Sequence, residues 1–182
     1  ILYMRSLIIN AMLLCGLFLL LPGNLSAKDY RGAEIRTHDN HFYGRFEVRM
    51  KSAKGHGIVS SFFTYNVGGQ QPRDWNEIDI EFLGRHDEQV DFNIITYYEV
   101  SHVVEQPLHY DPSEAFHTYA FEWTPTYVSW SVDGFEVYRE LASHVNQLTF
   151  PQRLMMNIWP PIWTDWVGVL NEDDLPVYAY YD

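Results

Sequence analysis

The sequence predicts an all-β fold, in which one domain is built from two antiparallel sheets packed as a sandwich. Three observations support this prediction. Apolar and polar residues alternate with the two-residue period of a strand over residues 45–51, 76–83, 90–97 and 153–159. Asp133-Gly134 is a strong signal for a two-residue hairpin turn. After residue 27, the sequence contains no persuasive amphipathic helix, repeat or low-complexity tract.

The first elements follow from local patterns. Residues 33–37 are expected to form a short strand. In residues 45–51 the apolar side chains are expected to face the core and the charged ones water. A Gly-His-Gly turn leads into an apolar strand at residues 58–65, and residues 68–73 form a loop marked by glycine and proline.

The later elements continue the same architecture. Alternation or enrichment in β-branched and aromatic residues predicts further strands at residues 90–97, 117–123, 127–132, 135–139 and 153–159. Residues 140–147 fit either a loop or a single helical turn.

Residues 1–27 are expected to be a secretory signal peptide. Arg5 supplies a positive charge, residues 7–21 are nearly uncharged and apolar, and residues 25–27 offer a cleavage site. The apolar run is short for a membrane span of about 20 residues, so we expect export rather than anchoring. Residues 28–182 are then the mature domain of a secreted or periplasmic protein.

Composition narrows the possible partners. The only cysteine, Cys15, lies in the expected signal peptide, so no disulfide or thiol nucleophile is expected in the domain. The formal net charge of −12 disfavours nucleic acid, anionic membranes and polyanionic polysaccharides as partners. Aromatic residues make up 16% of the chain, which suits stacking on neutral sugars, although β-proteins are often aromatic-rich.

The most informative stretch runs from Trp75 to Leu83. As a strand it sends Glu77, Asp79 and Glu81 to one face and three apolar side chains to the other. Acidic residues are depleted in strands and like charges on one face repel, so the trio is difficult to explain as scaffold. A solvated acidic face and a hard-cation site remain alternatives.

Spacing suggests a use for the carboxylates. The Cα atoms of Glu77 and Glu81 are roughly 13 Å apart in a strand, and side chains leaning together would bring the carboxyl groups to about 5 Å. Retaining glycosidases use a separation of about 5–5.5 Å and inverting ones about 6.5–9.5 Å. Crowding also predicts that at least one carboxyl group keeps its proton to higher pH, as a general acid requires.

Residues 77–84, Glu-Ile-Asp-Ile-Glu-Phe-Leu-Gly, resemble the active-site signature of glycoside hydrolase family 16, especially its bacterial lichenases. The resemblance extends from about Gly32 to Asp182. It implies a concanavalin-like β-jelly-roll with Glu77 as nucleophile, Glu81 as acid/base and Asp79 as the assisting carboxylate. It also implies further strands in the family, so this sandwich is expected to be short at both ends.

The resemblance further assigns polar and aromatic residues to a substrate cleft: Glu34, Arg36, Phe63, Tyr65, Asn93, Asn157, Trp159 and Trp166. From the residues alone, the first two would be a surface ion pair and most of the aromatic ones core. Ile95 departs from the family, because lichenases usually have tyrosine there. Residues 160–162, Pro-Pro-Ile, replace an Asn-Gly type of loop and shorten the spacing to Trp166 by one residue.

These observations lead to a functional hypothesis. The chain is expected to be a secreted retaining endo-β-glucanase acting on 1,3-1,4-β-glucan, monomeric and without a cofactor. No metal is expected, since the spacings of His102, His109 and His117 match no zinc signature. The alternatives are a related hydrolase or transglycosylase acting on laminarin or a bacterial exopolysaccharide, and a non-catalytic carbohydrate-binding module.

Overall fold

The alternating sequence patterns form strands that are arranged in two sheets. The computed structural model describes residues 30–69, 71–98 and 100–182, so the expected signal peptide and Cys15 lie outside the described residues. The first sheet has the strand order β1 (Ala33–Arg36), β11 (Arg153–Trp159), β3 (Val59–Tyr65), β4 (Asn76–Leu83), β5 (Gln89–Thr96) and β6 (Val100–Ser101). β7 (Val104–Pro107) also pairs with β5.

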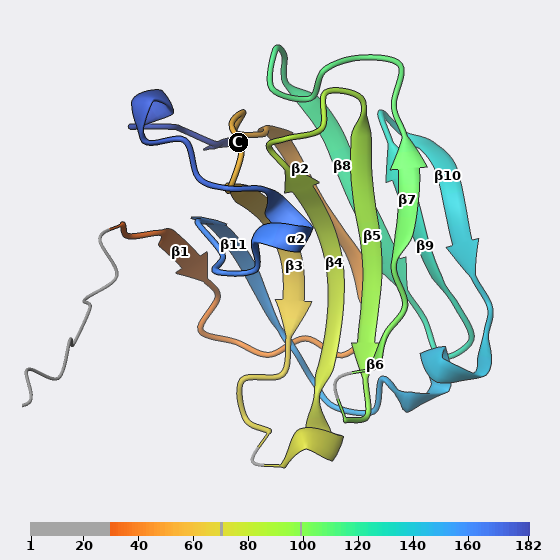
Figure 1. Cartoon of the computed structure of the whole chain (residues 1–182). Coiled ribbons are helices and arrows are strands. Elements are labelled where there is room, and N and C mark those ends of the chain that lie inside the picture. Colours follow the sequence, from red (N-terminus) through yellow and green to blue (C-terminus); the bar gives the residue numbers. More distant parts are fainter. Residues whose placement is uncertain (1–29, 70, 99) are drawn as a thin grey trace, which may run out of the picture. The chain divides into compact units, whose positions relative to one another are not determined.

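The second sheet lies behind the first in Figure 1. Its strand order is β10 (Phe135–Glu140), β9 (Val128–Val132), β8 (His117–Trp123), β2 (Gly44–Lys51) and β12 (Tyr180–Tyr181). Neighbouring strands are antiparallel in both sheets. The prediction of an all-β sandwich of two antiparallel sheets is therefore confirmed.

The core lies between the two sheets. In β2 the apolar residues are buried and the charged residues are exposed or partly exposed, as the alternation predicts. In β4 the buried face consists of Ile78, Ile80 and Phe82, each at most 1% exposed. They pack in one cluster with residues of the second sheet such as Phe121 and Trp130. Because β4 uses this face for the core, its alternate residues must point away from it.

Short helical turns join several strands: η1 (Pro72–Asp74), η2 (Ser143–Gln147), α2 (Thr164–Val167) and η3 (Glu172–Asp174). Of the two alternatives for residues 140–147, the helical turn is present as η2. The sequence did not predict α2, β6 or β7, which are too short to establish a period. No helix among the described residues is long and apolar enough to cross a membrane.

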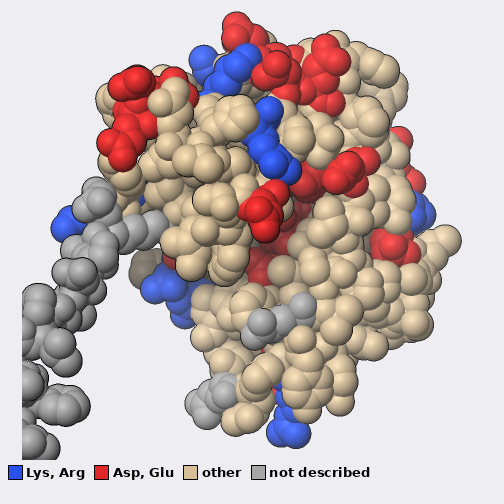
Figure 2. Space-filling model, viewed as in Figure 1, with Lys and Arg blue, Asp and Glu red and all other residues tan. Residues whose placement is uncertain are grey.

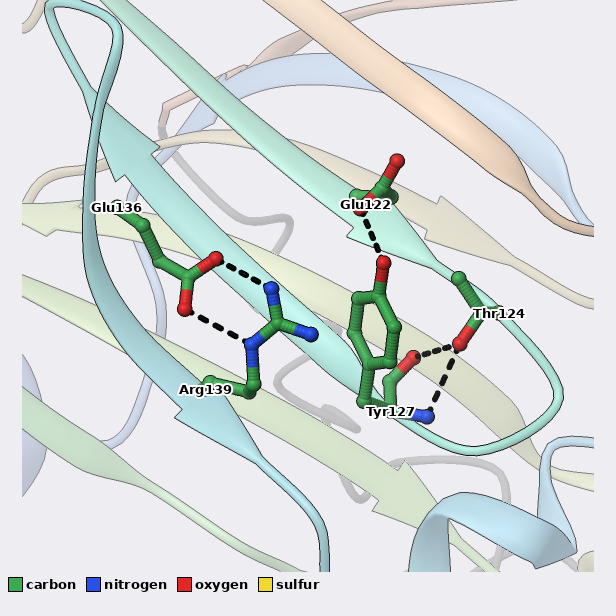
Figure 3. Close-up of polar contacts among 5 residues, drawn as sticks. All are labelled: Glu122, Thr124, Tyr127, Glu136 and Arg139. Atoms are coloured by element: carbon green, nitrogen blue, oxygen red, sulfur yellow. Dashed lines mark hydrogen bonds and ion pairs between the residues drawn. The ribbon is translucent and has the colours of Figure 1, made fainter.

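The exposed face of the second sheet is held by polar contacts across the hairpins (Figure 3). Arg139 forms two hydrogen bonds to Glu136, of 2.8 and 2.6 Å, and its guanidinium lies 3.8 Å from the centre of the Tyr127 ring. The Tyr127 hydroxyl donates to Glu122. Asp133 and Gly134 both have positive φ, which fits the hairpin turn that the sequence predicts. Such exposed pairs contribute little stability individually.

Candidate active site

The centre of the site is the face of β4 that points away from the core. Strand register places three pairs of neighbours beside the three acids: Tyr65 and Ile95 beside Glu77, Phe63 and Asn93 beside Asp79, and Ser61 and Asp91 beside Glu81. Directly paired residues of antiparallel strands project to the same face. The carboxylate face is therefore continuous over β3, β4 and β5.

The same face continues across β11 and β1. Asn157 of β11 pairs with Ser61 of β3 on one side and with Glu34 of β1 on the other. In the same way Met155 of β11 pairs with both Phe63 and Arg36, so Arg36 lies in the same row as Phe63. Trp159 pairs with Val59, which pairs with Leu83. Three strands that are distant in sequence thus bring the predicted residues of β1, β3 and β11 to the carboxylate face.

Trp166 reaches this face through α2. Val167 packs on Val59 and Leu83, together with Trp159 and Trp166. The helix therefore covers one end of the face, in front of β3 and β4 in Figure 1. Figure 2 shows acidic side chains at the bottom of a hollow in the middle of this face, with mostly uncharged surface beside it.

The predicted substrate-contacting residues differ in accessibility. Phe63 is only 7% exposed, so it forms part of the floor rather than a free platform. Asn93 is 4% exposed, and its Oδ1 accepts hydrogen bonds from the Ser101 hydroxyl and the His102 backbone N–H. Glu34 and Arg36 are exposed and lie 3.9 Å apart as an ion pair. All eight share the carboxylate face, while their contacts with sugar stay predictions.

Sequence reasoning missed Trp75 as a site residue. Its indole N–H donates a 2.6 Å hydrogen bond to Oε2 of Glu77, and its ring lies 5.5 Å from that of Tyr65. The signal was present, because Trp75 precedes Glu77 by two residues and the strand period puts both on one face. A hydrogen bond of this kind orients the carboxylate.

The protein environment raises the pKa of all three carboxyl groups. Burial is the main cause, and it raises the pKa of Glu77 to about 7, although hydrogen bonds from Trp75 and Asp79 act against the rise. Burial and then the charges of Glu77 and Asp91 raise the pKa of Glu81 to about 8. Burial and the charges of Glu77 and Glu81 hold the pKa of Asp79 well above its usual range. A carboxyl group whose pKa is raised in this way, such as that of Glu81, can hold a proton to donate near neutral pH.

The raised pKa of Glu81 predicts a pH-dependent cost in stability. In the unfolded chain Glu81 ionises near pH 4.5, whereas in the folded protein it stays protonated until about pH 8. The free energy of unfolding of the wild type should therefore fall as pH rises through this interval. The neutral variant Glu81→Gln should escape this loss. Its stability relative to wild type should therefore be higher at pH 8 than at pH 4.5, by up to about 4 kcal/mol.

Urea unfolding at the two pH values measures this effect. Glu88→Gln is the matched control, because Glu88 is an exposed glutamate in the turn after β4. A stability difference between Glu81→Gln and wild type that does not change with pH would contradict the prediction.

A second prediction concerns the support beneath Asp79. The indole N–H of the buried Trp130 donates a 3.0 Å hydrogen bond to the backbone oxygen of Asp79, which ties β9 to β4. Trp130→Phe should lower the free energy of unfolding through both lost packing and this lost bond. Trp123→Phe is the control, because the buried Trp123 N–H has no hydrogen-bond partner among the described residues.

We expect Trp130→Phe to lose about 1 kcal/mol more than Trp123→Phe, which is the net contribution of one buried hydrogen bond. Urea unfolding followed by circular dichroism measures both variants. Equal losses would show that the bond to Asp79 contributes nothing measurable.

The arrangement suits acid–base and nucleophilic chemistry at a polar substrate. Within the described ranges, no group of three or more histidine, cysteine, aspartate or glutamate residues is arranged to hold a metal ion. Two partly exposed glutamates flank a buried aspartate at the bottom of a hollow with aromatic residues on its face. This arrangement can attack a carbon from one carboxylate and donate a proton from the other.

Comparisons with known proteins agree with this chemistry. Residues 22–168 match the family model described as Glycosyl hydrolases family 16. A beta-glucanase of Brevibacillus brevis is 45% identical over 159 residues, which are 86% of this chain and 60% of that protein. A beta-glucanase of Fibrobacter succinogenes is 42% identical over 88% of this chain and 47% of its own length. The chain thus spans about half to three fifths of these two relatives.

Solved structures show the same fold. A beta-1,3-1,4-glucanase (lichenase) derived from a mouse hindgut metagenome has a TM-score of 0.76 and 45% identity, over 87% of this chain and 72% of that one. The Bacillus licheniformis beta-glucanase has a TM-score of 0.73 and 40% identity, over 81% and 67% of the two chains. The Crh5 transglycosylase, at 30% identity and a TM-score of 0.71, covers 85% of this chain and 67% of its own.

Proposed function

The chain belongs to family 16 of the glycosyl hydrolases, and from this premise we propose that it is a secreted, retaining endo-β-glucanase that cleaves 1,3-1,4-β-glucan. The observation that supports the proposal most directly is the carboxylate face of β4. There Glu77 and Glu81 lie on either side of Asp79, and burial raises the pKa of both glutamates toward the neutral range, where one can be ionised while the other holds a proton.

The proposed reaction has two steps. A carboxylate oxygen of Glu77 bonds to the anomeric carbon while the glycosidic bond breaks, and Glu81 gives its proton to the departing sugar oxygen. Glu81, now ionised, then takes a proton from water as the water oxygen displaces Glu77 from the anomeric carbon. Two inversions at one carbon leave its configuration unchanged.

Asp79 assists by keeping Glu77 ionised. Because its own pKa is held well above its usual range, Asp79 keeps its proton to higher pH than an ordinary aspartate, and in that form it can donate a hydrogen bond to the Glu77 carboxylate. That bond and the one from Trp75 both favour the ionised form of Glu77. With one proton on Asp79 and another on Glu81, Glu77 is the carboxyl group of the three that is ionised and acts as nucleophile.

The preference for mixed-linkage glucan rests on the similarity to lichenases. Proteins described as lichenase or beta-glucanase are 40–45% identical to this chain, whereas the Thermotoga maritima laminarinase is 25% identical with a TM-score of 0.69. The departure at Ile95 lies beside Glu77, so it is the position at which the linkage preference would change. The similarity to a transglycosylase makes glycosyl transfer the second candidate.

Reducing-sugar release from lichenan, laminarin and an acidic exopolysaccharide tests the proposal. We expect rapid release from lichenan, slower release from laminarin and none from the acidic polymer, because the chain carries a formal net charge of −12. Product analysis by chromatography distinguishes hydrolysis from transfer, since transfer yields products longer than the substrate. Activity on none of the three substrates would overturn the proposal.

A further inference from the structure

One exposed tryptophan near the site has no role in the reaction proposed above. Trp163 precedes α2 and is 58% exposed. It follows the Pro-Pro-Ile segment at residues 160–162, where the sequence departs from the lichenase pattern. An indole left in water forgoes the favourable burial of a large apolar surface. Trp163 is not isolated, because its ring lies beside those of Trp159 and Trp166, and clustered apolar surface of this kind often marks a ligand-binding groove.

The Trp163 side chain is supported from two sides. Its ring lies edge-on to Trp159, with centroids 5.9 Å apart and an angle of 89°, and 6.3 Å from the ring of Trp166. Its backbone oxygen accepts hydrogen bonds from the N–H groups of Trp166 and Val167, of 3.0 and 3.1 Å. The hydrogen bonds fix the Trp163 backbone at the first turn of α2, and the ring lies against its two tryptophan neighbours.

Strand register relates this cluster to the carboxylates. Trp159 shares a row with Leu83, which is two residues beyond Glu81 and on the same face of the sheet. Two residues of a strand span about 6.6 Å. The three tryptophans therefore form a wall immediately beyond the Glu81 end of the site, and Trp163 is its most exposed member.

We propose that Trp163 is an additional platform for a glucosyl residue of the polysaccharide, which extends the binding cleft beyond Trp159 and Trp166. The inference rests on the proposed glucanase function. The wall is continuous with the carboxylate face, and aromatic rings present flat apolar surfaces that suit the C–H faces of a neutral sugar. An aromatic platform that lies away from the scissile bond strengthens substrate binding more than it speeds the chemical step.

Kinetics of Trp163→Ala on mixed-linkage glucan tests this platform. We expect KM to rise about three- to tenfold with kcat within about twofold of wild type, because a uniform binding contact is lost. Trp163→Phe should keep KM within about twofold. Ile162→Ala is the matched control, because Ile162 is a 73% exposed apolar neighbour in the same loop, and it should behave as wild type.

A binding assay separates this inference from the proposed function. Affinity electrophoresis in gels containing mixed-linkage glucan should retard Glu77→Gln, and adding Trp163→Ala to that variant should weaken the retardation. A wild-type KM for Trp163→Ala, or an equal change in Ile162→Ala, would overturn the platform while leaving the glucanase proposal intact. If the wild type hydrolyses no glucan but Trp163→Ala still abolishes retardation, the glucanase proposal fails and the platform stands.

Discussion

Glu77→Gln is expected to lower kcat on mixed-linkage glucan by at least about 10⁴-fold, because the amide cannot form the glycosyl intermediate. The fold should be retained. Glutamine has nearly the same shape, and its amide oxygen can still accept the hydrogen bond that Trp75 donates to Glu77. Reducing-sugar assays measure the loss, and circular dichroism with thermal unfolding checks the fold.

Glu47→Gln is the matched control for this experiment. Glu47 lies on the exposed side of β2 in the second sheet and pairs with Arg45 at the surface. Its replacement should leave kcat and KM unchanged, since exposed pairs contribute little. If Glu77→Gln stays active while folded, Glu77 is not the nucleophile and the reaction proposed here is wrong.

Glu81→Gln is expected to lower kcat on the polymer by about 10²- to 10⁴-fold, because the departing sugar oxygen no longer receives a proton. A substrate with an activated leaving group, such as a nitrophenyl glycoside, needs little protonation in the first step. Accumulation of the glycosyl-enzyme with such a substrate should therefore remain fast in the variant. Rapid-mixing kinetics, which separate the first step from the second, measure this contrast.

The pH profile gives an independent test of Glu81. The wild type needs Glu77 ionised and Glu81 protonated, so activity should fall on the alkaline side as Glu81 loses its proton near pH 8. Because the three carboxyl groups interact, the apparent pKa values of the acidic and alkaline limbs belong to the coupled carboxyl groups together. The alkaline limb should disappear in Glu81→Gln. A variant that keeps the same limb would show that another group supplies the proton.

Much of the fold was predictable because strand patterns are local. Period-two alternation in β2 and β4 separates core-facing from outward-facing residues without knowledge of any neighbour. The Asp133-Gly134 hairpin turn is likewise encoded in two adjacent residues. The short elements α2, β6 and β7 escaped prediction, since α2 is stabilised by packing of Val167 on Val59 and Leu83 rather than by its own four residues.

The sequence by itself determined which side chains share a face within one strand, including the acids of β4, because side-chain alternation depends only on the backbone. Tertiary structure alone decided that β1, β11 and β3 lie side by side, which brings Glu34, Asn157 and Ser61 into the row of Glu81. It also decided the raised pKa of Glu81, since burial depends on neighbours distant in sequence. Strand order and desolvation are non-local, and for that reason no local pattern contains them.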